Sequence, residues 1–359
     1  MPLTLAAVLA DWHTHLPQLC SYAELCPPAQ GWGAGEVRLA TPLQYPGKVL
    51  CAGANYFDHL AEMGVPDTRK EAQRLFFFFK PPRNALVGHA SVVAMPRHTT
   101  MLDWEVELAL VIGKRAKNLT LETALDAVAA YTVAIDLSAR DLNRAPDTFY
   151  KLDWVAGKAQ DQCCPLGPWL VPAQFIGNPQ DLALSLSVNG LLKQSARSSG
   201  MVFDIREQLV ALSAIMTLDP GDVVLTGTPA GVGFPKGTFL APGDRVEARI
   251  EGIGSLAVTI GPQFDAFVAE QIVPLMKRFP GVRAVRVLRA LSVEEDGPPL
   301  HMTFESVYDS PQAMAHAFTF PVRQELKARM QEILPLFDGR LFHVTHRLLA
   351  DEALAPAKP

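Results

Sequence analysis

The sequence predicts an α+β protein with a mixed β-roll in the middle of the chain and a smaller α+β domain after it. Between residues 46 and 260, short segments of strand character are separated by Asn-Gly and Pro-Gly turns, and helical segments are few. This pattern favours a mixed or antiparallel β-roll over a doubly wound sheet. After residue 264 the expected order becomes helix, strand, strand, helix, strand, which is the order of a ferredoxin-like domain.

Composition excludes several classes of protein. The 359 residues are 49% hydrophobic and 19% charged, which suits two or three folded domains rather than a disordered chain. A net charge of -5 without basic runs argues against nucleic acid as a partner. The five cysteines lack C-x-x-C spacing, so we expect reduced thiols and a cytoplasmic location. The apolar run 3–10 is short and has no basic flank, so we expect neither a signal peptide nor a membrane helix.

The expected elements follow in chain order. Residues 1–45 are rich in Pro, Gly and Ala and form a small N-terminal region. In the central region, 46–260, helices are expected at 55–62, with Asn55 as the N-cap, at 121–130 and at 204–216. Strands are expected at 48–52, 75–79, 105–112, 131–136, 182–188, 222–226, 245–250 and 255–260.

The C-terminal domain is expected to span 264–359. It begins with an amphipathic helix at 264–279, and strands at 282–291 and 300–308 flank an acidic turn. Residues 311–337 are helical with a break near Phe320 and Pro321, and a last strand covers 341–348.

Two glutamates on the expected strand 105–112 are the strongest chemical signal. Because side chains alternate along a strand, Asp103, Glu105 and Glu107 share one face, where like charges repel unless a cation lies between them. Asp136 closes an otherwise apolar strand and is a candidate third ligand. Three carboxylates without nearby Cys or His favour Mg²⁺ or Mn²⁺ over zinc. The alternative is a solvated strand face for the glutamates and a helix N-cap for Asp136.

Other residues are candidates for catalysis and substrate binding. His59 and Glu62 lie three residues apart on one helix face, so Glu62 could orient His59 as a general base for water. Lys158 could stabilise developing negative charge, and Arg140, one turn after Asp136, could bind a substrate carboxylate. The alternatives are an ordinary exposed helix pair and two surface cations.

A glycine-rich loop at 226–233 follows an expected strand. It has no Gly-Lys-Ser/Thr sequence, which disfavours a P-loop. The loop could instead present backbone N–H groups and the Thr228 hydroxyl to an anionic substrate. A simple tight turn fits the sequence equally well.

Taken together, these segments resemble the fumarylacetoacetate hydrolase family over about residues 46–260. Six separated motifs in the family's order are more specific than any one of them. The matching stretches are 55–62, 79–81, 104–109, 136–141, 157–158 with 165–168, and 218–233.

The resemblance implies a mixed β-roll, usually a homodimer, with the His59–Glu62 pair activating water on a segment that closes as a lid. It implies Mg²⁺ or Mn²⁺, with Ca²⁺ as a substitute, held by Glu105, Glu107 and Asp136. Lys158 is then a catalytic residue. Asn143 stands where the family usually carries glutamine, which is expected to shift substrate preference. The positions that match substrate-binding sites are Arg140, Asn143, Lys80, Tyr56, Gly227 and Thr228.

The resemblance also implies a hydrolase that cleaves a C–C bond in a 1,3-dicarbonyl acid of the acylpyruvate or fumarylacetoacetate type. The partner is then a small oxo-acid, with no nucleic acid and no membrane. The alternatives are a decarboxylase or isomerase of 2-oxo or dienoate diacids in aromatic catabolism, and a catalytically silent binding or scaffold protein. The tail from residue 264 loosely resembles an EthD-like dimeric α/β-barrel domain, which would reinforce dimerisation.

Overall fold

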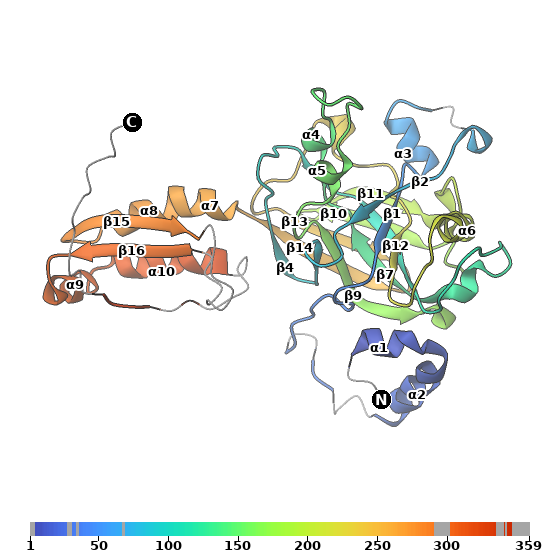
Figure 1. The fold of residues 1–359 in the computed structure, drawn as a ribbon, viewed down its shortest axis with the longest axis horizontal. Coiled ribbons are helices and arrows are strands. Elements are labelled where there is room, and N and C mark those ends of the chain that lie inside the picture. Colours follow the sequence, from blue (N-terminus) through green and yellow to red (C-terminus); the bar gives the residue numbers. More distant parts are fainter. Residues whose placement is uncertain are drawn as a thin grey trace, which may run out of the picture.

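The chain folds around two mixed β-sheets, shown in the centre of Figure 1. None of the helices in the described ranges combines the length and apolarity that a membrane span needs. The structure is a computed structural model, and it describes residues 4–26, 31–33, 36–66, 69–290, 302–334, 341 and 343–346.

The larger sheet has seven strands in the order β2-β1-β12-β6-β7-β9-β3. Its central strand β6 is buried along its whole length and carries one charged residue, Glu107, in a run of apolar side chains. A strand that is buried on both faces needs apolar side chains at almost every position. The bounds are β1 (Val49–Gly53), β2 (Phe76–Lys80), β3 (Leu86–Val87), β6 (Val106–Ile112), β7 (Val128–Ile135), β9 (Cys164–Pro172) and β12 (Val223–Leu225).

The smaller sheet has five strands in the order β11-β10-β13-β14-β4. Alternate residues of β10 are buried, as expected for a strand with one face on the core. Both sheets contain parallel and antiparallel pairs, and one hydrophobic cluster includes Leu108 and Ile135 of the first and Leu186 and Val258 of the second. The predicted mixed β architecture is confirmed. The bounds are β4 (Ser91–Ala94), β10 (Ala183–Val188), β11 (Leu191–Arg197), β13 (Arg245–Ile250) and β14 (Gly254–Gly261).

Some predicted elements are wrong. The helix expected at 121–130 is a 3-10 helix, Ala124–Ala127, followed directly by β7, because residues from Val128 on pair with β6. Six strands in the described ranges were not predicted, namely β3, β4, β5, β8, β9 and β11, of which β5 (Leu102–Asp103) pairs with β8 (Ser138–Ala139). The helix expected at 204–216 is confirmed as α6 (Ile205–Ile215), with a capping box between Asp204 and Glu207.

The N-terminal region holds two helices that were not predicted, α1 (Leu5–Ala10) and α2 (Trp12–Leu25). Leu9 and Trp12 join the hydrophobic cluster that also contains Val49 of β1 and Val223 of β12. These helices therefore pack against the larger sheet through apolar side chains.

The C-terminal part has its own hydrophobic clusters, whose buried members all lie between Phe267 and Ile333. Of the last strand expected at 341–348, the described residues 341 and 343–346 form no strand, and the acidic turn lies outside the described residues. The ferredoxin-like domain and all three domain boundaries stay predictions. The elements are α7 (Phe264–Phe267), a π-helix (Val268–Ile272), α8 (Val273–Lys277), β15 (Val282–Arg289), β16 (Met302–Tyr308), α9 (Pro311–Ala317) and α10 (Val322–Ile333).

Candidate metal centre

Three carboxylates meet where β6 and β7 lie side by side. The strands are antiparallel with Val106 opposite Ile135, so Glu105 comes to lie beside Asp136, whose N–H donates to the Glu105 carbonyl at 2.9 Å. Glu107 lies two residues further along on the same face. One ligand oxygen from each of the three carboxylates lies within 4.8 Å of the others, and all three residues are buried.

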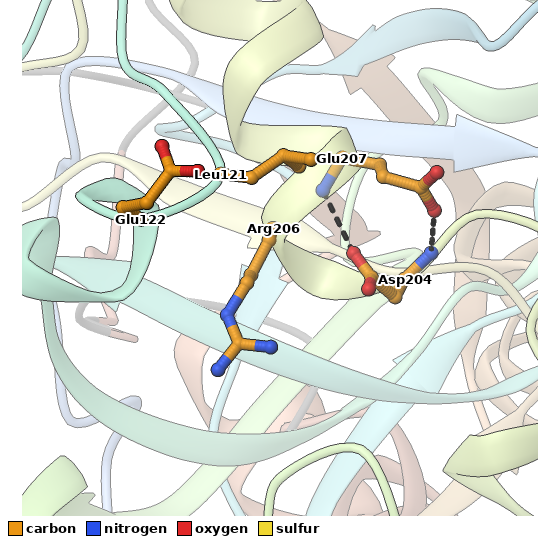
Figure 2. A pocket seen from close by; sticks show the side chains of 5 residues that line it. All are labelled: Leu121, Glu122, Asp204, Arg206 and Glu207. Atoms are coloured by element: carbon orange, nitrogen blue, oxygen red, sulfur yellow. Dashed lines mark hydrogen bonds between the residues drawn. The ribbon is translucent and has the colours of Figure 1, made fainter.

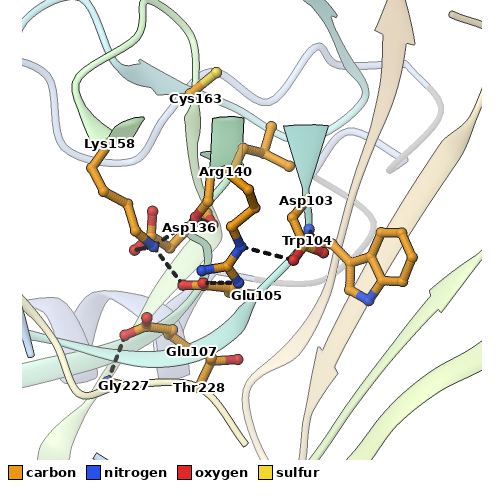
Figure 3. Close-up of polar contacts among 12 residues, drawn as sticks. Asp103, Trp104, Glu105, Glu107, Asp136, Arg140, Lys158, Cys163, Gly227 and Thr228 are labelled. Carbon is orange, nitrogen blue, oxygen red and sulfur yellow. Dashed lines mark hydrogen bonds and ion pairs between the residues drawn. The ribbon is translucent and has the colours of Figure 1, made fainter. Parts of the chain in front are cut away.

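Two lysines bind these carboxylates from one side. Lys158 ends the short helix α5 (Trp154–Lys158), and its Nζ lies 2.7 Å from Glu105 Oε2 and 2.8 Å from Asp136 Oδ2 (Figure 3). Its third hydrogen goes to the Ser138 hydroxyl at 2.6 Å. Lys80 Nζ lies 2.7 Å from the other oxygen of Asp136. Asp136 is therefore fully compensated by two ammonium groups.

Arg140 binds a second pair of carboxylates. It begins the short helix α4 (Arg140–Asn143), and its Nε donates to Asp103 Oδ2 at 2.8 Å. Its Nη2 lies 2.6 Å from Glu105 Oε1. Burial alone would raise the pKa of Glu105, but the charges of Lys158 and Arg140 outweigh it and hold that pKa below its ordinary value.

Glu107 is the exception in this cluster. It forms no ion pair with any residue in the described ranges, and its Oε2 accepts a hydrogen bond of 2.6 Å from the Gly227 N–H. Burial, together with the charges of Asp136 and Glu105, raises the pKa of Glu107 well above its usual range. Its charged form therefore requires an additional cation.

The residues present fit a divalent cation. With Glu107 ionised, the carboxylates of Asp103, Glu105, Glu107 and Asp136 face three protein cations, so one negative charge is uncompensated. The three clustered carboxylates offer oxygen ligands only, which suits a hard cation such as Mg²⁺ or Mn²⁺. The predicted group of Glu105, Glu107 and Asp136 is brought together by the fold.

The predicted pair of His59 and Glu62 is also formed. Both lie on α3 (Phe57–Glu62), and His59 Nδ1 lies 2.8 Å from Glu62 Oε1. The other oxygen of Glu62 accepts from the Gly231 N–H at 2.9 Å, and these two bonds outweigh the effect of burial and lower the pKa of Glu62. Residue 56, not the predicted Asn55, is the N-cap, because the Asn55 side chain instead binds the Phe203 and Thr226 backbone.

The glycine-rich loop uses its N–H groups within the protein. Gly227 (φ +99°) donates to Glu107, and Gly231 (φ +105°) donates to Glu62. The Thr228 hydroxyl donates to the Val106 carbonyl at 2.9 Å. These three donors thus bind two carboxylates and a carbonyl of the protein itself, and contacts of Gly227 and Thr228 with a substrate stay predictions.

Of three other predicted substrate contacts, Lys80 and Asn143 form hydrogen bonds within the protein, and the Tyr56 hydroxyl forms none with the described residues. Lys80 is fully buried and donates its three hydrogens to the carbonyls of Leu137, Lys158 and Cys163, so none remains for a substrate, and it contacts Asp136 as an ion pair. Asn143 donates to the Asp153 carbonyl at 3.3 Å. Tyr56 is fully buried, and its hydroxyl has no hydrogen-bond partner among the described residues. The substrate-lining role predicted for Lys80 does not fit this burial.

Replacing Lys80 is expected to destabilise the protein. Lys80→Met leaves the buried Asp136 with one of its two ammonium partners, which should lower the free energy of unfolding by about 3–5 kcal/mol. Urea denaturation of the purified variants measures this loss. The control is Lys70→Met, which breaks the partly exposed pair with Glu207 and should cost about 0–1 kcal/mol. Equal losses in both variants would contradict the role of Lys80.

A surface hollow near α6 is unrelated to these carboxylates. It is lined by residues of the α6 N-terminus and of the loop before β7 (Figure 2), and no predicted site residue is among them. The lining residues are Leu121, Glu122, Asp204, Arg206 and Glu207.

The two mixed sheets and the carboxylate group define a class of α+β proteins with a divalent-metal centre. Residues 48–261 match the family model described as fumarylacetoacetate (FAA) hydrolase C-terminal. The chain belongs to this family, and the predicted recognition is confirmed.

Relatives of this chain include enzymes of three kinds. Oxaloacetate tautomerase FAHD2B, mitochondrial, of Bos taurus is 41% identical over 221 residues, which are 61% of this chain and 68% of that protein. A fumarylpyruvate hydrolase from Pseudomonas aeruginosa, solved with Mn²⁺ and pyruvate, is 34% identical with a TM-score of 0.55 over 62% of this chain and 91% of that one. A 2-hydroxyhepta-2,4-diene-1,7-dioate isomerase from Mycobacterium marinum is 35% identical with a TM-score of 0.55, covering 66% and 82%.

Proposed function

We propose that this chain is a divalent-metal-dependent hydrolase that cleaves a C–C bond in a 1,3-dicarbonyl acid, such as an acylpyruvate. The observation that carries this proposal is the formed His59–Glu62 pair together with the three clustered carboxylates, which one loop connects because Gly231 donates to Glu62 and Gly227 to Glu107. The similarity to a fumarylpyruvate hydrolase solved with Mn²⁺ and pyruvate supports it.

Glu105, Glu107 and Asp136 would hold Mg²⁺ or Mn²⁺. When bound, the cation supplies Lewis-acid polarisation of the substrate oxygens. It also turns the net charge of the cluster positive, which favours an anionic oxo-acid as the substrate. Arg140 stays the candidate for the substrate carboxylate, through its Nη1 group, which no described carboxylate occupies.

His59 would activate the attacking water. Because Glu62 Oε1 lies next to Nδ1, the proton sits on Nδ1, and Nε2 is left as an acceptor without a partner among the described residues. His59 Nε2 takes a proton from water, and the hydroxide forms a C–O bond to the carbonyl carbon distal to the carboxylate. The C–C bond then breaks, and its electron pair leaves as the enolate of the 2-oxo acid, which takes up a proton at carbon.

Lys158 would stabilise the negative charge that develops. Its three hydrogens are donated to Glu105, Asp136 and Ser138, so it would act on the enolate through its charge and not through a hydrogen bond. A buried, preoriented cation stabilises such charge far more than water does.

A second candidate function is tautomerisation of oxaloacetate, favoured by the 41% identity to an oxaloacetate tautomerase. There His59 would move a proton between carbon and oxygen without consuming water. The similarity to a dienedioate isomerase supports an isomerase of 2-oxo diacids in the same way. The complete carboxylate group and the formed pair argue against a silent binding protein.

Product analysis in water enriched in oxygen-18 separates these activities. The protein is incubated with Mg²⁺ and a panel of acylpyruvates, oxaloacetate and dienoate diacids, and the products are identified by mass spectrometry. Hydrolysis predicts two shorter products, with the label in the new carboxylate of the acid released. Conversion of oxaloacetate or a dienoate without C–C cleavage, and no cleavage of any acylpyruvate, would overturn the hydrolase proposal.

The expected homodimer, the cytoplasmic location and the dimer-reinforcing role of the C-terminal region stay predictions. The same holds for the choice between Mg²⁺ and Mn²⁺ and for the absence of nucleic-acid and membrane partners.

A further inference from the structure

Beyond the end of β12, side chains replace the backbone as hydrogen-bond partners of β6, close to the glutamates Glu105 and Glu107. Strand β12 pairs with β6 as far as Leu225, which lies opposite Ala109. Beyond it, the N–H and the hydroxyl of Thr226 both donate to the Leu108 carbonyl, at 3.1 and 2.8 Å. At Val106, two residues before Leu108 on β6, the side chains of Gln194 and Thr228 take the place of backbone groups of β12.

Gln194 closes a ring of hydrogen bonds around Val106. Its Oε1 accepts from the Val106 N–H at 2.9 Å, and its Nε2 donates to Thr228 Oγ1 at 2.9 Å and to the Pro229 carbonyl at 2.8 Å. The Thr228 hydroxyl in turn donates to the Val106 carbonyl at 2.9 Å. Both backbone polar groups of the residue between Glu105 and Glu107 are thus bound by side chains.

Gln194 reaches this place from the other sheet. It lies on β11, an edge strand whose remaining residues are exposed or half-buried, yet Gln194 itself is fully buried. Both hydrogens of its amide are used, so a carboxylate or an apolar side chain cannot make the same bonds. A buried amide that is fully bonded in this way fixes the groups it joins.

The loop held by Gln194 contacts both halves of the site. Gly227 donates to Glu107, and Gly231 donates to Glu62, the partner of His59. Gly231 also lies against β11, since a Cβ at this position would lie 2.1 Å from the Lys193 carbonyl oxygen. The loop is therefore confined to one position, between the glutamates of β6 and strand β11.

We propose that Gln194 is a positioning residue that sets Glu107 of the metal centre and the His59–Glu62 pair at a fixed separation. It acts through Thr228 and Pro229 on the loop, and through Val106 on the strand. Its effect on turnover rests on the proposed function, whereas its effect on the loop does not. Residues that orient metal ligands in this way change metal affinity or activity by roughly 10–100-fold when replaced.

The test compares Gln194→Met with Gln208→Met. Gln208 is also fully buried, and its amide donates to the Phe203 carbonyl and the Met201 sulfur, with no hydrogen bond to β6 or to residues 226–233 among the described residues. Three quantities are measured for each variant: hydrogen exchange of residues 226–233 in the metal-free protein by mass spectrometry, Mn²⁺ affinity by calorimetry, and kcat and KM. The melting temperature of each variant measures the general loss of stability that follows from removing a buried amide.

We expect both variants to melt at lower temperature than the wild type. Gln194→Met alone should show faster exchange in the loop, Mn²⁺ binding weaker by about tenfold or more, and a fall in kcat. Should Gln194→Met not fold, Gln194→Glu carries the comparison, because it keeps its length and the bond from the Val106 N–H while losing both donors.

Unchanged loop exchange and unchanged Mn²⁺ affinity in a folded Gln194 variant would overturn the proposal, as would equal changes in the Gln208 control. Failure of the metal-dependent function looks different. In that case the wild type binds no Mn²⁺, and the exchange comparison in the metal-free protein still decides the role of Gln194.

Discussion

Changing Asp136 to asparagine is expected to lower the free energy of unfolding of the metal-free protein by about 3–5 kcal/mol, whereas Glu107→Gln should leave it nearly unchanged. Asp136 lies 2.7 Å from Lys80 Nζ and 2.8 Å from Lys158 Nζ, so its loss leaves the buried Lys80 ammonium without a carboxylate among the described residues, while Lys158 keeps Glu105. Glu107 has no such partner among the described residues, and its raised pKa favours the neutral form, which glutamine resembles in shape and charge. Both variants should nevertheless lose divalent-cation binding.

Urea denaturation in the presence of a chelator measures the stability difference, and Mn²⁺ titration measures the binding. The pair is its own control, because each variant replaces one buried carboxylate of the same group by its amide. Similar destabilisation of both variants would contradict the finding that Lys80 and Lys158 form ion pairs with Asp136 and not with Glu107.

His59→Ala is expected to lower kcat by roughly 10²–10⁴-fold while Mn²⁺ affinity stays unchanged, since His59 acts as a general base and not as a ligand. Its Nδ1 is bound by Glu62, so only Nε2 can take the proton of water. Steady-state kinetics on the substrate found in the panel, together with Mn²⁺ calorimetry, measures both quantities.

Glu62→Gln is a second, milder change in the same His59–Glu62 pair. Glu62 accepts from His59 Nδ1 and from the Gly231 N–H through separate oxygens, so the single amide oxygen of glutamine can keep one of these bonds. The negative charge that stabilises a protonated imidazole is also gone, but the imidazole itself remains, so the loss should be smaller than for His59→Ala. If His59→Ala kept most of the wild-type turnover, water activation by this pair would be wrong.

Local patterns were sufficient to predict the parts of the site that lie close together in sequence. The two-residue spacing of Glu105 and Glu107 places both on one strand face, and the three-residue spacing of His59 and Glu62 places both on one helix face. Asp136 followed from a carboxylate at the end of an apolar strand. These pairs are formed in the structure.

Contacts between distant segments could not be predicted in the same way. Lys80 looked like a pocket residue, yet its partners lie 57, 78 and 83 positions away, at Leu137, Lys158 and Cys163. Gln194 is a single polar residue on an edge strand, and no local pattern points to Val106, 88 positions earlier. The helix expected at 121–130 failed for a similar reason, since pairing with β6 decides the conformation from Val128 on.

A calorimetric titration of the chelator-treated wild type and of Glu107→Gln with MnCl₂ tests the central claim most directly. We expect one Mn²⁺ bound per chain in the wild type through Glu105, Glu107 and Asp136, and loss of this binding in a Glu107→Gln variant that remains folded. No binding to the wild type, or equal binding to both proteins, would contradict the assignment of this carboxylate group as a metal centre.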